Sequence, residues 1–350
     1  MSTNEPLVSI VTPVYNESAY LPECIESVLN QTYKNWEYVI VDNCSKDGSA
    51  EIARRYAAKD SRIRVVSNDQ FLRAIPNHNH ALRQISVDSK YCKIVLGDDW
   101  IYPECLERMV AVAESNSRVG LVGAYLLEGT EVKCTALSHD AHVSNGSWIC
   151  REHFLHSLYV FGSANSVLYR SDLVRARSSF FNENNIHADT EVCFELLKDS
   201  DFGFVHQVLT FTRLRPKSLA TISADLNTCS PGMLHTLREY GPIYLTDEEQ
   251  TRLWNQRVTE YHEFLAKSLL KGRDDKFWTF HKTKLSELGV QISRLQLFTT
   301  LLKLGCISLL NPLSTSQRLF GAWSRSRSSS QSGAVLRPVN AANSGSKGTA

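Results

Sequence analysis

Short runs of apolar residues alternate with amphipathic segments through the first 125 residues of the chain. Apolar runs rich in Val and Ile and ended by turn residues are typical of strands, whereas apolar positions at helical spacing are typical of helices. These patterns predict strands at residues 8–11, 36–41, 62–66, 91–96 and 119–127. They predict helices between the strands at residues 17–30, 50–57, 74–85 and 103–114.

This alternation of strands and helices indicates an α/β fold. Strands that are apolar almost throughout are typical of a parallel sheet covered by helices on both faces, so we expect a mostly parallel sheet of that kind. No G-x-G-x-x-G follows the first predicted strand, and the chain has no G-x-x-x-x-G-K-[ST]. If phosphates bind to this sheet, a glycine-rich loop does not hold them.

The remainder of the chain is less regular at first and then helical. Residues 131–221 mix short strands, loops and one clear helix at 189–197, and a helical C-terminal extension follows. Beyond residue 323 the composition is rich in Ser, Gly, Asn and Ala and predicts disorder. We therefore expect a catalytic-type domain at 1–225, a helical region at 226–322 and a tail at 323–350. The helices expected in the extension are 231–240, 247–271 and 276–288.

Polar side chains follow several of the predicted strands. Parallel sheets bind ligands at the carboxyl ends of their strands. Carboxylates at such an edge would repel a phosphate directly, so they imply a divalent cation between the two. The residues at these ends are Pro13, Tyr15 and Asn16 after the first strand, Asp42 and Asn43 after the second, and Asp98 and Asp99 after the fourth.

Composition excludes several classes of protein. Thirty-eight Lys and Arg against 37 Asp and Glu give a net charge of +1, which argues against a strongly basic nucleic-acid binder. The first residues do not show the pattern of a secretory leader, and no apolar run is long enough to cross a bilayer, so we expect neither a leader nor a membrane span. Nine Cys without any C-x-x-C pair predict reduced thiols, and therefore a cytoplasmic protein.

The near-neutral total conceals an uneven distribution of charge. Seven Lys or Arg and no Asp or Glu follow Glu287, so the first 287 residues carry a net charge of −6. The basic stretch overlaps the apolar segment 295–310. Residues 290–325 therefore predict either a helix lying on an anionic membrane surface, or a helix packed on the protein with a solvated tail. The first alternative would place the protein at the inner face of the cell membrane.

The N-terminal motifs resemble those of a family 2 glycosyltransferase of the GT-A type. The segments that carry the resemblance are VSIVTPVYNE at 8–17, CIESVLNQTY at 24–33 and YVIVDNCSKDGS at 38–49. The similarity is dense over about residues 7–115 and continues loosely to about 220. It implies a nucleotide-sugar-binding half at 7–125 and an acceptor half at 126–225.

The resemblance also implies roles for residues at the strand ends. Pro13, Tyr15 and Glu17 match the loop that holds the nucleotide base in the family, and an aromatic ring with a carboxylate suits a flat base with N–H donors. Asp42, followed by Asn43, matches the acid that binds the base or the ribose. A carboxylate that accepts from ribose hydroxyls serves dinucleotide-binding folds in the same way.

Asp98 and Asp99 match the family's D-x-D region, although Leu96 stands where many members have the first acid. The resemblance implies that Asp99 or Asp98 binds Mn²⁺ or Mg²⁺, and that the other contacts ribose or diphosphate. Such an ion neutralises the leaving nucleoside diphosphate. Arg215 occupies a position where the family often has a His, and because Arg cannot bind a metal, the third protein ligand stays open.

Asp189 is the candidate catalytic base. The segment ADTEVCF at 188–194 resembles the family's "ED" segment with Ala188 in place of Glu, which leaves Asp189 as the matching carboxylate and Glu191 as the alternative. An inverting transfer needs one base to take the proton of the acceptor hydroxyl. The loop 162–166 is a candidate for the acceptor side.

The resemblance implies an inverting, metal-dependent glycosyltransferase that moves a sugar from a nucleoside-diphosphate sugar to an acceptor hydroxyl. The expected setting is surface polysaccharide biosynthesis, with a glycan or lipid-linked acceptor and no nucleic-acid partner. Two alternatives stay open. One is a nucleotide-sugar-binding pseudoenzyme that acts as a scaffold, and the other is a sugar nucleotidyltransferase, whose Gly-rich loop with Arg and Lys this chain lacks.

Overall fold

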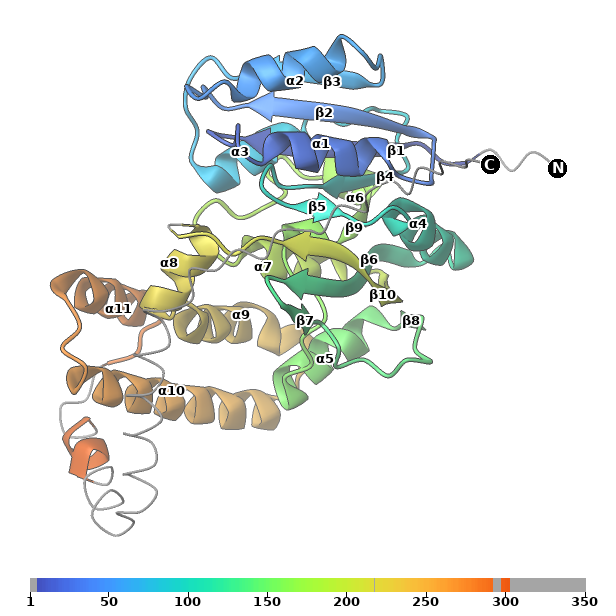
Figure 1. The fold of residues 1–350 in the computed structure, drawn as a ribbon. Coiled ribbons are helices and arrows are strands. Elements are labelled where there is room, and N and C mark those ends of the chain that lie inside the picture. Colours follow the sequence, from blue (N-terminus) through green and yellow to red (C-terminus); the bar gives the residue numbers. More distant parts are fainter. Residues whose placement is uncertain (1–4, 217, 292–296, 303–350) are drawn as a thin grey trace, which may run out of the picture. The chain divides into compact units, whose positions relative to one another are not determined.

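A mixed sheet of ten strands forms the centre of the protein (Figure 1). The structure, a computed structural model, describes residues 5–216, 218–291 and 297–302. Eight strands follow the order β3-β2-β1-β4-β9-β6-β10-β5, and β7 and β8 pair with β6 and β10. The strands are β1 (Val8–Val14), β2 (Trp36–Asp42), β3 (Ile63–Ser67), β4 (Tyr91–Ile94), β5 (Trp100–Ile101), β6 (Val119–Glu128), β7 (Glu131–Lys133), β8 (Val143–Ser144), β9 (Leu168–Arg170) and β10 (Asp201–Thr212).

The five strands that the apolar pattern predicts are all present, as β1 to β4 and β6, and the α/β class is confirmed. Strands β3, β2, β1 and β4 are parallel to one another, and β6 is parallel to β10. The fourth strand ends at Ile94 and not at residue 96, because the chain turns there, with the N–H of Asp99 donating to the carbonyl of Leu96 at 3.0 Å. This turn places the Asp98–Asp99 pair at the carboxyl edge of the sheet.

The short strand β9 lies between β4 and β6 and is antiparallel to both. It joins the N-terminal strands to β6 and β10. Its three residues are too few to show an alternation of apolar and polar positions, so the sequence pattern did not predict it. The two parts of the sheet therefore depend on a strand that becomes visible only in the fold.

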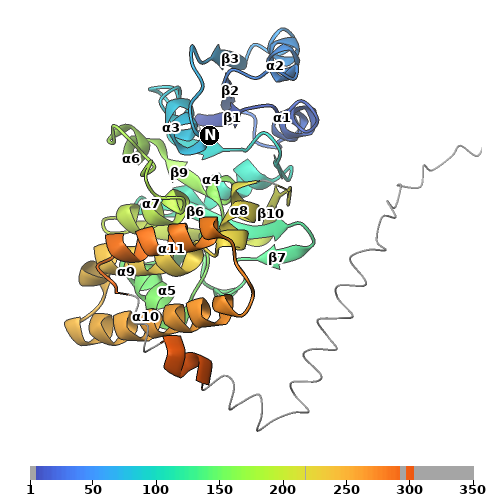
Figure 2. The same ribbon diagram turned by 90° about the vertical axis from the view of Figure 1, so that its left-hand side faces the viewer.

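Helices cover both faces of the sheet. In Figure 2, α3 lies on one side of strands β1 to β3, and α1 and α2 lie on the other. The helices are α1 (Leu21–Leu29), α2 (Ser49–Ala57), α3 (Ala74–Leu82), α4 (Cys105–Ser115), α5 (Gly146–His156), the 3₁₀ turn η1 (Ala164–Ser166), α6 (Ser171–Arg175), α7 (Ala188–Leu196), α8 (Leu219–Leu226), α9 (Cys229–Tyr244), α10 (Asp247–Leu269) and α11 (Asp275–Glu287).

Two hydrophobic clusters form on the two faces of the sheet. Val8 and Ile10 of β1 belong to the cluster that contains the apolar side chains of α1 and α4. Val11 belongs to the other cluster, with residues from α3, α5 and α7. Successive residues of a strand point to opposite faces, so a strand buried on both faces must be largely apolar. This explains why the continuous apolar runs predicted the strands correctly.

The helix α9 contributes to the core of the sheet-containing part. Its Tyr240 and Tyr244 are buried beside Phe194 of α7, and the hydroxyl of Tyr244 donates to the carbonyl of Phe194. The described residues fall into two compact units, one of residues 5–216, 218–261 and 273–291 and one of residues 262–272 and 297–302. The expected division of the chain near residue 225 stays a prediction.

Most of the basic segment 290–325 lies outside the described residues, so its contact with a membrane stays a prediction. Within the ranges that the structure describes, no helix has both the length and the apolar character needed to cross a bilayer.

Gly146, at the start of α5, is a position where we expect a larger side chain to destabilise the fold. A Cβ atom on this residue would lie 2.1 Å from the carbonyl oxygen of Ser200 and 2.5 Å from that of Leu197. We expect Gly146→Ala to lower the free energy of unfolding by about 1–3 kcal/mol, because the backbone must move to relieve these contacts. Urea denaturation measures this change. The neighbouring exposed Ser147→Ala is the control, and equal stability of the two variants would contradict the prediction.

Candidate functional site

Hydrogen bonds tie the loop after β1 to the loop after β2. The N–H of Asn16 donates to Ser45 Oγ at 3.0 Å, and the N–H of Glu17 donates to Ser49 Oγ at 2.9 Å. The side chain of Asn16 in turn accepts from the N–H of Lys46 at 2.8 Å. The candidate residues of both loops are therefore held at one edge of the sheet, as the parallel strand order requires.

Two exposed aromatic rings stand at this edge. The ring of Tyr15 contacts that of Phe71, with centroids 4.7 Å apart, and the two residues are 43% and 54% exposed. Phe71 follows β3 and was not among the candidates from the sequence. A single aromatic residue in a loop gives no periodic signal, so only the fold brings it beside Tyr15. Exposed paired rings offer a stacking surface for a flat ligand.

The buried side chain of Asn43 holds the loop that carries Phe71. Its Nδ2 donates to the carbonyl of Leu72 at 2.7 Å, and its Oδ1 accepts from the N–H of Leu72 at 2.8 Å and from Asn68 Nδ2 at 2.9 Å. Asn43 therefore supports the aromatic pair through its loop. All of its amide atoms are occupied within the protein.

Asp42, which ends β2, is buried but retains an acceptor atom. Its Oδ2 accepts from the N–H of Ser45 at 3.4 Å, whereas among the described atoms its Oδ1 has no hydrogen-bond partner. Buried polar atoms are nearly always satisfied in native proteins. A free carboxylate oxygen at a strand end is therefore suited to accept from a ligand hydroxyl.

Arg215 bridges two candidate carboxylates. Its guanidinium donates to both oxygens of Glu17, at 2.7 and 2.8 Å, and its Nε lies 2.5 Å from Asp98 Oδ2. Burial raises the pKa of Glu17 above its ordinary value, although the hydrogen bond from Arg215 opposes this rise. Pro13 is buried at the end of β1, two residues before Tyr15. No pattern in the sequence predicts that Arg215 holds Glu17 and Asp98 together.

Asp99 differs from Asp98 in its surroundings. Asp99 is 2% exposed, its Oδ1 accepts from the N–H of Arg213 at 2.8 Å, and its Oδ2 accepts from Thr212 Oγ1 at 3.3 Å. Burial, and then the charge of Asp98, raise the pKa of Asp99 well above its usual range. Asp98, whose side chain is 13% exposed, is the member of the pair that is better placed to contact a ligand.

The oxygen atoms at this edge fit a divalent cation that a ligand completes. Among the residues that the structure describes, no three His, Cys, Asp or Glu gather into a cage for a metal ion. Mg²⁺ at phosphate sites, however, is usually bound by one or two carboxylates together with phosphate oxygens and water. Within the described part of the chain, Asp98, which has only Oδ2 paired with Arg215, supplies a carboxylate of this kind.

The η1 turn connects the end of β10 to the sheet core beside the carboxylates. Ser163 Oγ lies 3.5 Å from Thr212 Oγ1, and Asn165 Nδ2 donates to the carbonyl of Phe211 at 3.1 Å. The fully buried Lys93 donates to the carbonyl of Asn165 at 2.8 Å. The turn is thus fixed to β10, whose last residue, Thr212, donates to Asp99 together with the N–H of Arg213.

Asp189 lies in the first turn of α7, next to η1. Its Oδ1 accepts from the N–H of Thr190 at 2.8 Å. Burial raises the pKa of Asp189, and hydrogen bonds from the backbones of Thr190 and Ala164 oppose this rise. Through Ala164, the candidate base is joined to the turn that contacts β10. Residues 162–166 therefore connect the Asp98–Asp99 region to Asp189.

The alternative base, Glu191, is occupied by other side chains. It accepts from Asn182 at 3.1 Å and from Asn185 at 2.7 Å. Burial tends to raise the pKa of Glu191, but the nearby His235 and the hydrogen bonds from the two Asn residues outweigh it and lower the pKa. A carboxylate stabilised in its charged form is a weaker base, so the surroundings favour Asp189 over Glu191.

Comparison with known proteins finds similarity to glycosyltransferases. Residues 9–176 match the family described as Glycosyl transferase family 2, which confirms the resemblance. EpsE of Bacillus subtilis (strain 168), provisionally named a glycosyltransferase, is 39% identical over 35% of this chain and 44% of its own length. An uncharacterized glycosyltransferase of Haemophilus influenzae is 28% identical over 53% of this chain and 58% of its own. The chain spans about half the length of the curated relatives it matches.

Solved structures show the fold independently. The crystal structure of S. aureus TarS 1-349 in complex with UDP-GlcNAc matches with a TM-score of 0.61 and 15% identity, over 80% of each chain. The mannosyltransferase PcManGT from Pyrobaculum calidifontis, in complex with GDP-Man and Mn²⁺, matches with a TM-score of 0.50 and 14% identity over 86% of this chain and 88% of its own. The chain thus has the GT-A type of fold that the sequence motifs implied.

Because Arg215 bridges Glu17 and Asp98, we expect its substitution to lower the stability of the protein. Arg215→Ala leaves Glu17 and Asp98 as close, largely buried carboxylates, and we expect the free energy of unfolding to fall by about 1–3 kcal/mol at neutral pH. Without the guanidinium the pKa of Glu17 rises further. The loss of stability is therefore full at pH values above this pKa, and it shrinks as the pH falls through this pKa. Urea denaturation at neutral and acidic pH measures both effects.

The control is Lys284→Ala, which removes an exposed ion pair to Glu287 and is expected to cost at most about 0.5 kcal/mol. A loss for Arg215→Ala that is equally large at acidic pH would show that the bridge does not act through the charges of the carboxylates.

Proposed function

We propose that this chain, whose residues 9–176 match glycosyl transferase family 2, is an inverting glycosyltransferase. It transfers a sugar from a nucleoside-diphosphate sugar to an acceptor hydroxyl. The observation that carries the proposal is the arrangement of Asp42, Asp98 and Asp189, which lie at one edge of the sheet or are joined to it through η1. A donor site and a base beside an acceptor site are what a direct sugar transfer needs.

The donor is proposed to bind along the ends of β1, β2 and β4. The nucleotide base stacks on Tyr15 and Phe71, and the free Oδ1 of Asp42 accepts from a ribose hydroxyl. Pro13 shapes the turn that presents Tyr15, and Asn43 supports Phe71 through the Leu72 loop. The ligands named for the solved relatives, UDP-GlcNAc and GDP-Man, support this class of donor.

The diphosphate is proposed to lie beside Asp98, Glu17 and Arg215. Mn²⁺ or Mg²⁺ held by Asp98 would neutralise the charge of the leaving diphosphate. Asp99 supports Asp98 from the buried side through its bonds to residues 212 and 213. The guanidinium of Arg215, which pairs with Asp98 and Glu17 in this structure, is a second source of positive charge for the phosphate oxygens.

Asp189 is proposed to take the proton of the acceptor hydroxyl. The acceptor oxygen then bonds to the anomeric carbon from the face opposite the diphosphate, and the bond from that carbon to the diphosphate oxygen breaks with its electron pair. The nucleoside diphosphate leaves and the anomeric configuration inverts. The raised pKa of Asp189 makes its carboxylate a stronger base than an exposed Asp.

A role in surface polysaccharide synthesis fits the names of the relatives. TuaG of Bacillus subtilis (strain 168), 36% identical over 31% of this chain, is provisionally named for teichuronic acid biosynthesis. The proposed acceptor is a growing glycan or a lipid-linked precursor. A panel of nucleotide sugars assayed with Mn²⁺ and such acceptors tests the proposal, and the absence of both nucleotide binding and transfer would overturn it.

The stacking surface yields a prediction about the donor. Tyr15→Ala and Phe71→Ala are each expected to weaken the binding of UDP or GDP about tenfold, because loss of base stacking costs about 1–3 kcal/mol. Isothermal titration calorimetry with Mn²⁺ measures the dissociation constants. Trp148→Ala removes an aromatic ring of similar exposure elsewhere and is the control. Unchanged affinity in both loop variants would exclude the pair from the donor site.

The catalytic base yields a second prediction. Asp189→Asn preserves the size of the side chain but cannot accept the proton, so we expect transfer to fall roughly 10²–10⁴-fold while nucleotide binding is unchanged. Glu191→Gln is the matched control, and we expect it to retain most of the activity. Normal turnover by Asp189→Asn would remove Asp189 from the mechanism. Loss of transfer in Glu191→Gln alone would assign the base to Glu191.

A further inference from the structure

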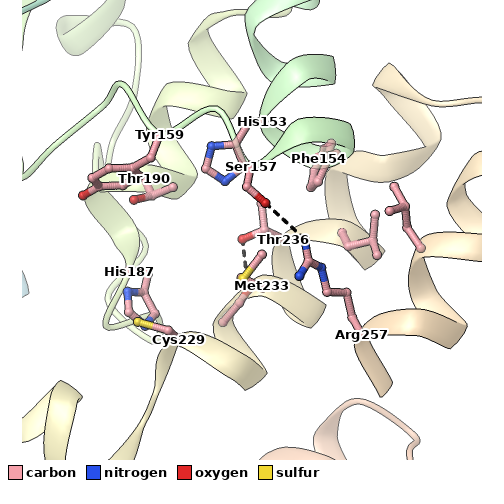
Figure 3. A pocket seen from close by; sticks show the side chains of 13 residues that line it. His153, Phe154, Ser157, Tyr159, His187, Thr190, Cys229, Met233, Thr236 and Arg257 are labelled. Carbon is pink, nitrogen blue, oxygen red and sulfur yellow. Dashed lines mark hydrogen bonds between the residues drawn. The ribbon is translucent and has the colours of Figure 1, made fainter. Parts of the chain in front are cut away.

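A cavity of about 340 Å³ opens between α5, α7, α9 and α10, in the same compact unit as the sheet (Figure 3). Its volume is at the lower end of the range for small-molecule sites. None of the roles assigned above uses it. Its lining residues are His153, Phe154, Ser157, Tyr159, His187, Thr190, Cys229, Gly232, Met233, Thr236, Leu237, Leu253 and Arg257.

The polar side chains that line the cavity mostly bond to the protein. His153 Nδ1 lies 3.0 Å from the carbonyl of Leu158, and the hydroxyl of Tyr159 donates to the carbonyl of Gly162 at 2.9 Å. Thr236 Oγ1 donates to the carbonyl one turn earlier in α9 at 3.0 Å. Burial lowers the pKa of His153 to about 4, so this ring is neutral at pH 7. The surface that the cavity presents is therefore mainly carbon.

The polar and charged side chains that line the cavity do not suit a sugar or a phosphate. Among the described lining residues there is no Asp, Glu, Asn or Gln, the side chains that commonly bind sugar hydroxyls. The single charged residue, Arg257, is already paired with Glu260 at 2.9 Å. Phe154, Leu237 and Leu253 are buried apolar residues of three different helices. An apolar ligand group would bury carbon surface here without leaving polar groups unpaired.

The cavity begins beside the proposed base. His187 and Thr190, which flank Asp189 in the sequence, both line it. Figure 3 shows Tyr159 next to Thr190 at one side of the cavity. Burial, and then the charge of Asp189, raise the pKa of Tyr159. A ligand in the cavity therefore lies close to the carboxylate that would receive the acceptor proton.

We propose that this cavity binds the hydrocarbon part of an amphiphilic acceptor and thereby presents the acceptor hydroxyl to Asp189. This proposal rests on the proposed function and specifies its acceptor, which is a sugar or alcohol head group joined to an alkyl or isoprenoid chain. Binding energy from a chain that does not react is well suited to position the reacting hydroxyl. Free, fully polar glycans do not gain this energy.

Octyl β-glucoside below its micelle concentration and methyl β-glucoside are the two probes, since they differ only in the chain. Titration calorimetry on the full chain is expected to show binding of the octyl glucoside at least roughly tenfold tighter than that of the methyl glucoside. Met233→Glu places a carboxylate in the cavity and is expected to remove at least roughly tenfold of the octyl affinity. Met233→Leu keeps the apolar surface of the cavity and is expected to retain the affinity for octyl glucoside.

The matched control is Ile243→Glu, which changes another exposed apolar residue of α9 that does not line the cavity. It is expected to leave octyl binding unchanged. If Met233→Glu does not fold, as judged by its thermal melt, Met233→Trp tests the same point by filling the cavity. Equal binding of the two glucosides, or equal loss in the variants at 233 and 243, overturns the proposal.

Binding of UDP and GDP to the same proteins separates the two proposals. Nucleotide binding that is normal in Met233→Glu, together with lost octyl binding, supports a separate acceptor cavity. Normal nucleotide binding with no octyl binding in the natural sequence overturns the cavity proposal alone. Failure to bind any nucleotide, with octyl binding intact, counts against the glycosyltransferase function and removes the reason to call the octyl ligand an acceptor.

Discussion

The buried carboxylate of Asp99 is the contact on which the arrangement of the site depends. It follows β4 and accepts hydrogen bonds from Thr212 and from the N–H of Arg213, at the end of β10. Two other strands, β9 and β6, separate β4 from β10 in the sheet. A carboxyl group buried without partners costs several kcal/mol, so these bonds fix the two strand ends relative to each other. Asp98 and the segment with Arg215 are placed as a consequence.

Opposite charges at this edge partly offset each other within the protein. Glu17 and Asp98 come from the loops after β1 and β4, and the guanidinium of Arg215 lies between them. Carboxylates that are held close together repel each other, and this cluster of opposite charges offsets the repulsion. The same cluster contains both a carboxylate for a cation and a cation for a phosphate. The residues that partly offset each other's charge in the structure are thus the ones that would bind the diphosphate in the proposed reaction.

The sequence predicted the N-terminal part of the fold well because its strands are buried on both faces and its helices on one. These patterns are local and do not need a partner to be recognised. The roles of Asp42, Asp98 and Asp189 came from motifs and their positions in the predicted elements, and they stay predictions. Phe71, the short strand β9 and the bridge of Arg215 had no local signal. Each of these features forms between residues that are far apart in the chain, and Arg215 and Glu17 are one example.

The sequence by itself determined the α/β class, the parallel core and the strand ends at which polar residues gather, because apolar periodicity and turn residues act over a few positions. The tertiary structure alone decided which acid of the Asp98–Asp99 pair is buried, since the N–H of Arg213 reaches Asp99 from 114 residues away. It also decided that α5, α7, α9 and α10 leave a cavity beside Asp189. A cavity is defined by side chains of several helices that meet only after folding, so no single segment can encode it.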